Sequence, residues 1–133
     1  MGEVPLGMVV ETPVMEKANK KYAVLVGVNE YEKLNNLRFA ANDVKLIHDQ
    51  LLNMGFEPDH IFMLATDADA INMPIKRIIE ERIAQVLSSA GTDDMVFIAF
   101  AGHGVQIGDT VYFGPQDTQD EIANSAVSIN EVM

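Results

Sequence analysis

Residues 94–104 read DMVFIAFAGHG, a short apolar run that ends on a histidine between two glycines. A continuous apolar run of this length is typical of a strand buried on both faces of a parallel sheet. Catalytic groups collect beyond the carboxyl ends of such strands. Because imidazole titrates near neutral pH, His103 is the best candidate for a general base in the chain. The plainer alternative is a histidine that bonds to backbone at the strand end, and this stretch alone leaves both open.

Working outward, the sequence alternates buried strands with amphipathic helices. Apolar runs at 22–28, 61–64 and 95–100 predict three strands, and apolar residues at helical spacing predict helices over 37–54 and from a cap at Asn72 to Gly91. This order predicts the α/β class, with helices on both faces of a mostly parallel sheet in a three-layer α/β/α sandwich. Residues 105–107 and 111–113 flank Gly108-Asp109-Thr110, which predicts a hairpin beside His103.

Length and composition favour one globular domain. The chain has 133 residues, 48% of them hydrophobic, which is enough to bury a core. We expect residues 1–19 to form a flexible leader or pro-segment and residues 20–133 to form the domain. No apolar run approaches the roughly 20 residues that span a bilayer, and the start lacks a signal-peptide pattern. The sequence therefore predicts no membrane partner and a cytoplasmic location.

The charge balance is strongly acidic. The 20 acidic and 9 basic side chains give a formal charge of -11, which argues against a nucleic-acid partner because phosphate binding requires the opposite sign. No lysine or arginine follows Arg82, whereas acidic residues continue to Glu131. This asymmetry fits a cationic substrate or partner, or else a solvated acidic face.

Three segments in order carry a family resemblance. Residues 22–31 (YAVLVGVNEY), 37–44 (LRFAANDV) and 100–104 (FAGHG) resemble the large-subunit region of the caspase and metacaspase superfamily, most closely the metacaspases. The likeness covers residues 22–133. It implies a caspase-like fold and a cysteine-type endopeptidase, that is, a hydrolase that performs proteolysis.

The resemblance also assigns roles to residues. His103 would be the histidine of a Cys-His dyad, and the backbone amide of Gly104 would contribute to the oxyanion hole. Asp43 and Asp117 would line an acidic pocket that selects a protein or peptide substrate with arginine or lysine before the scissile bond. Ala101 stands in that pocket where the family usually has serine. The plainer alternatives are a first-turn helix acid for Asp43 and a turn residue for Asp117.

The chain has no cysteine, so it cannot supply the thiol of such a dyad. Ser128 and Glu131 form a capping box that predicts a helix start near the last residue. We therefore expect the fold to be incomplete at its C-terminus, and the chain to be inactive without a cysteine-bearing remainder in cis or as a second chain. The alternative is a catalytically dead caspase-fold module that docks to partner proteins.

No cofactor is predicted. The resemblance includes calcium-dependent relatives and makes Asp117 and Asp120 candidate ligands, but no specific motif in the sequence supports a calcium site. The sequence around Asp67 starts like a calcium loop without the glycine of its sharp turn. We therefore expect no bound metal ion.

Overall fold

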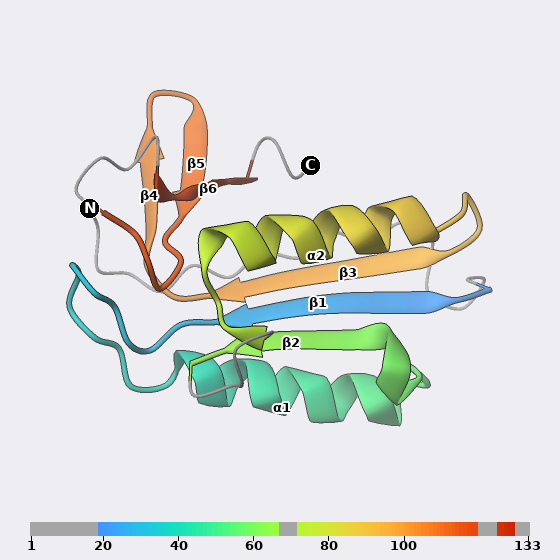
Figure 1. Ribbon diagram of the computed structural model, residues 1–133. Helices are drawn as coiled ribbons and strands as arrows, with labels where there is room; N and C mark the ends of the chain where they lie inside the picture. Colours follow the sequence, from blue (N-terminus) through green and yellow to red (C-terminus); the bar gives the residue numbers. More distant parts are fainter. Residues whose placement is uncertain (1–18, 67–71, 120–124, 130–133) are drawn as a thin grey trace.

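The computed structural model describes residues 19–66, 72–119 and 125–129. The expected leader, apart from Asn19, lies outside these residues. Figure 1 shows the arrangement of the elements. The strands are β1 (Lys21–Gly27), β2 (Ile61–Ala65), β3 (Met95–Ala101), β4 (Gly104–Ile107), β5 (Thr110–Phe113) and β6 (Val127–Ser128), and the helices are α1 (Ala40–Asn53), the short 3-10 helix η2 (Pro58–His60) and α2 (Lys76–Ser89).

The main sheet is parallel and has β1 at its centre. Its order is β2-β1-β3, with Val24 opposite Phe62 on one side and Ile98 on the other. Residues 23–26 are completely buried, as a strand covered on both faces requires. The predicted α/β class with a mostly parallel sheet is therefore confirmed.

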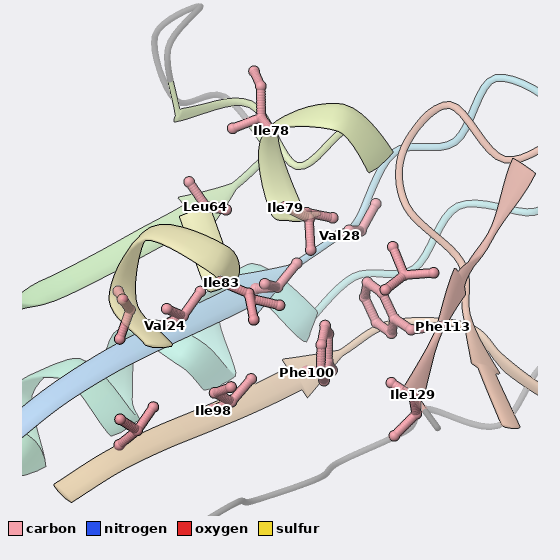
Figure 2. Packing of buried hydrophobic residues seen from close by; sticks show 14 of the residues in the cluster. Val24, Val28, Leu64, Ile78, Ile79, Ile83, Ile98, Phe100, Phe113 and Ile129 are labelled. Carbon is pink, nitrogen blue, oxygen red and sulfur yellow. The ribbon is translucent and has the colours of Figure 1, made fainter. Parts of the chain in front are cut away.

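The two helices cover opposite faces of this sheet, as Figure 1 shows. Side chains alternate along β1, so Val24 and Val26 lie in one core while Ala23 and Leu25 lie in the other. The first core takes its helical residues from α2, and Figure 2 shows Ile79 and Ile83 against it. The second takes Val44 and Leu51 from α1. These are the three layers that the sequence predicts. Within the described residues, no helix is long and apolar enough to cross a bilayer.

Helix α1 begins three residues later than predicted but ends where expected. Leu37 lies in the preceding loop, where its N–H donates to the carbonyl of Asn29 at 2.7 Å. At the other end, Gly55 adopts a φ of 92°, a left-handed conformation that stops a helix at little cost. The predicted stop at Gly55 is confirmed.

Helix α2 begins at Lys76, so the predicted cap at Asn72 is wrong. The N-cap position is held by Ile75, which has no side-chain oxygen. The carboxylate of Asp117 takes over this function, because its Oδ1 accepts the N–H of Lys76 at 2.9 Å. The segment before the helix is fixed separately, since the N–H of Gln116 donates to the carbonyl of Pro74 at 2.8 Å.

A second, antiparallel sheet of order β4-β5-β6 follows β3. The predicted hairpin is present as β4 and β5, which turn at Gly108 with a φ of 62°. Phe113 of β5 pairs with Val127 of β6, and its buried ring tilts against Phe100 with centroids 4.7 Å apart. Figure 2 shows how Phe113 joins the core of the main sheet. Ser128 ends β6, but its expected partner Glu131 lies outside the described residues.

Helix α1 approaches the sheet closely at Gly27. A Cβ placed there would lie 2.6 Å from Cγ2 of Val44 and 2.9 Å from the carbonyl oxygen of Ala40. The second contact is with backbone, so it cannot be relieved by a rotamer change. The substitution Gly27→Ala is expected to lower the free energy of unfolding by about 2 kcal/mol.

Urea unfolding followed by circular dichroism measures this loss. The matched control is Gly91→Ala, where the nearest atom to an added Cβ is Asp94 Oδ2 at 3.5 Å. That variant should stay within about 1 kcal/mol of the parent. Equal stabilities for the two variants would contradict the close approach at Gly27.

Candidate functional site

His103 lies two residues beyond the end of β3, at the carboxyl edge of the parallel sheet, and is only 2% exposed. The residue before it must be glycine, because a Cβ on Gly102 would lie 2.6 Å from the hydroxyl of Tyr31 and 3.0 Å from the ring of Phe113. The close packing brings the loop after β1 against the backbone of His103. The structure therefore has the histidine just beyond the end of a buried strand, as the sequence predicts.

The ring of His103 is held by a backbone carbonyl. Its Nε2 lies 2.7 Å from the carbonyl oxygen of Asn35. A carbonyl can only accept, so Nε2 carries the hydrogen of this bond. In a neutral imidazole the lone pair then resides on Nδ1, which makes Nδ1 the atom that can take up a proton. The bond to backbone and the role of a base are therefore compatible.

Tyr31 contacts the same histidine from the same loop. Its hydroxyl accepts the backbone N–H of His103 at 2.8 Å, and the two rings meet edge to face with centroids 4.7 Å apart. Burial raises the pKa of Tyr31 to about 12, an effect that the hydrogen bond from His103 partly offsets. The phenol is thus neutral throughout the pH range in which an imidazole titrates.

Two asparagine side chains shape this loop. Oδ1 of Asn36 accepts the N–H of Tyr31 at 2.9 Å, and Oδ1 of Asn29 accepts the N–H of Ala41 in the first turn of α1 at 3.1 Å. The hydroxyl of Thr66, just after β2, accepts the N–H of Asn29 at 2.9 Å. The loop is therefore tied to two neighbouring elements.

Sequence analysis missed the roles of Tyr31 and Asn35. The available signal was the polar segment directly after β1, at the edge where ligand-binding loops collect. Nothing in the residue type at position 35 marks its carbonyl as a partner of His103, so only the fold could reveal it.

Gly104 begins β4 opposite Phe113. The preceding carbonyl, that of His103, accepts the N–H of Gly114 at 2.8 Å, so His103 and Gly114 form a bonded pair. Bonded and non-bonded pairs alternate along an antiparallel ladder. The N–H of Gly104 therefore turns away from β5, and its role as a donor to an oxyanion stays a prediction.

Asp43 and Ala101 lie near the same edge of the sheet. Asp43 is an exposed residue in the first turn of α1, close to where that helix meets Gly27. Gly27 in turn pairs with the half-buried Ala101 at the end of β3. An acid in this turn also suits the helix dipole, so both interpretations of Asp43 agree with its position.

Asp117 has a structural task that the sequence did not reveal, since its Oδ1 caps α2. It is half-buried, whereas Asp43 is exposed on the helix that covers the opposite face. Among the described residues, no hydrogen bond or ion pair joins the two carboxylates. The structure thus gives Asp117 a structural contact and leaves the shared acidic pocket a prediction.

The described parts of the chain contain no cluster of candidate metal ligands. Within residues 19–66, 72–119 and 125–129, no three histidine, aspartate or glutamate side chains lie close enough together to hold an ion. Asp67 and Asp120 lie outside those ranges.

Comparison with known proteins gives one consistent result. The family model for the metacaspase, peptidase C14 domain matches residues 21–129. Metacaspase-3 of Arabidopsis thaliana is 36% identical over 112 residues, which are 82% of this chain and 30% of that protein. Metacaspase-1 of Lodderomyces elongisporus is 33% identical over 103 residues, 76% of this chain and 23% of that protein. The chain thus spans less than a third of these curated relatives.

The buried phenol predicts a specific pH dependence. In the unfolded chain Tyr31 ionises near its ordinary pKa of 10.0, whereas in the folded chain it stays neutral until about pH 12. Its contribution to stability is complete below pH 10 and is lost as the pH rises to 12, by about 2–3 kcal/mol in total. Unfolding by urea at several pH values should show this decline.

The comparison variant is Tyr31→Phe, which removes the titrating hydroxyl and keeps the ring. Its stability should fall less steeply than that of the parent between pH 10 and 12. Parallel curves would show that the Tyr31 phenol ionises normally in the folded chain.

Proposed function

Because this chain belongs to the metacaspase family, peptidase C14, we propose that it supplies the histidine half of the active site of a cysteine-type endopeptidase. The observation that carries the proposal is the setting of His103. The residue follows a buried strand, its Nε2 donates to the Asn35 carbonyl, and its Nδ1 therefore holds the lone pair.

The nucleophile in this proposal comes from a cysteine-bearing segment beyond these 133 residues, in cis or as a second chain, since they contain no cysteine. Nδ1 of His103 takes the proton of the thiol, and the thiolate attacks the scissile carbonyl carbon. The oxygen of that carbonyl becomes an oxyanion, to which the N–H of Gly104 donates. The imidazolium then returns its proton to the leaving amine, and water hydrolyses the acyl-enzyme.

The proposed substrates are proteins or peptides with arginine or lysine before the cleaved bond. Asp43 supports this specificity because its carboxylate is exposed near the carboxyl edge where His103 lies. Asp117 contributes less, since one of its oxygens already accepts from Lys76. Ala101 has a methyl group where a serine would add a hydroxyl, so the carboxylates alone would recognise the cation.

The test is turnover by the complete peptidase, in which this domain is joined to or mixed with its cysteine-bearing segment. Fluorogenic peptides ending in arginine, lysine or aspartate are compared at equal concentration. We expect cleavage after arginine and lysine, and a loss of at least about tenfold in kcat/KM for these two with Asp43→Asn, because an uncharged amide no longer pairs with the cation. A preference for aspartate would overturn the acidic pocket.

Two controls separate specificity from chemistry. His103→Ala in the same protein should lose nearly all turnover and keep its cooperative unfolding, while Asp49→Asn, an exposed acid later on α1, should leave turnover unchanged. Full activity of folded His103→Ala would refute the catalytic proposal. Complete inactivity of the parent assembly would favour the alternative, a caspase-fold module that docks to partner proteins.

A further inference from the structure

We propose that Tyr31 is a positioning residue for His103, holding the histidine backbone so that Nδ1 keeps a fixed direction. This inference rests on the proposed function, because it assigns Tyr31 a part in the same site. It goes beyond that function because the Tyr31 side chain would act through His103 and would not touch the substrate.

Besides the bond from Gly114 N–H to its carbonyl, two contacts from the loop after β1 hold His103. The Tyr31 hydroxyl accepts its backbone N–H at 2.8 Å, and the Asn35 carbonyl accepts from Nε2 at 2.7 Å. One anchor lies on the main chain and the other near the far end of the side chain. With both ends held, rotation about the two side-chain bonds of His103 would break the bond to Asn35.

Both anchors belong to one loop and are linked within it. The N–H of Tyr31 donates to Oδ1 of Asn36, which directly follows Asn35. The tyrosine hydroxyl and the Asn35 carbonyl are therefore kept in register with one another. The ring of Tyr31 adds contact area, since it meets the imidazole edge to face at 4.7 Å.

The histidine backbone needs such an external restraint. Gly102 and Gly104 flank it, and glycine restricts its own dihedral angles less than any other residue. The Tyr31 hydroxyl restrains the N–H side of the His103 backbone, and Gly114 restrains its carbonyl side. Gly102 is in turn the residue type that allows the hydroxyl to come close, because a Cβ there would lie 2.6 Å from it.

The contact is also independent of pH in the working range. Burial keeps the Tyr31 phenol neutral until about pH 12, as its raised pKa shows. The hydroxyl therefore accepts the same hydrogen bond whether the imidazole is neutral or protonated.

The experiment compares Tyr31→Phe with the parent chain of 133 residues by nitrogen-15 NMR of the His103 ring. At a pH at which the imidazole is neutral, the parent should show the Nε2–H tautomer, with one sharp set of signals. Tyr31→Phe should show broadened signals or a mixture of tautomers, and faster exchange of the His103 amide hydrogen. These signals come from folded molecules, so a loss of stability alone would not change the tautomer.

In the complete peptidase, kcat per titrated active site should fall about tenfold in Tyr31→Phe, with KM within about twofold of the parent, because the substrate contacts are intact. The matched control is Tyr22→Phe, which removes the same hydroxyl near the other end of β1, where the ring stacks on His60. It should match the parent in both measurements. Asn36→Ala, which keeps the Tyr31 hydroxyl but removes the acceptor of its N–H, should change both in the same direction by less.

The outcomes separate this inference from the proposed function. An unchanged tautomer and kcat in Tyr31→Phe, alongside an inactive His103→Ala, would overturn the positioning role and leave the peptidase proposal intact. An active His103→Ala would overturn the peptidase proposal, while the NMR comparison would still decide whether Tyr31 orders the ring. A Tyr22→Phe effect as large as that of Tyr31→Phe would also contradict the specific role.

Discussion

The parallel pairing of β1 with β3 is the constraint on which the candidate site depends. Their register places Gly27 opposite Ala101, so both strands end at the same level. The loop that leaves β1 and the segment that follows β3 must therefore emerge at the same edge of the sheet, as Figure 1 shows. The N–H of Val28, which donates to the carbonyl of Ala101 at 3.0 Å, extends this pairing by one residue into the loop. Tyr31 and Asn35 reach His103 because of this common end point.

The main elements could be predicted from the sequence because their signals are local. Three short apolar runs became three parallel strands, and residues at helical spacing became α1 and α2, one on each face. Burial on both faces leaves a continuous apolar run, and burial on one face leaves a periodic one, so the two types are readily distinguished. The position of His103 beyond a strand end followed from the same logic.

The features that could not be predicted depend on contacts between distant residues. The start of α2 is set by Asp117, which lies 41 residues beyond Lys76 along the chain. The hydroxyl of Tyr31 meets an amide 72 residues away. A local pattern favours a cap at Asn72 because it cannot include a carboxylate supplied by another loop. The contact between Asp117 and Lys76 also distinguishes the two candidate acids. Asp117 stabilises a helix end, whereas Asp43 is exposed to solvent.

The acceptor at position 35 has an evolutionary consequence. The oxygen that holds Nε2 of His103 belongs to the main chain, so every amino acid at that position would provide it. A substitution at position 35 leaves this carbonyl oxygen in place, so the contact with the imidazole does not depend on which side chain stands there. What selection must preserve is the path of the backbone, through the neighbours that bend it, rather than the identity of the residue that makes the contact. A histidine anchored in this way is buffered against point mutation at its own partner.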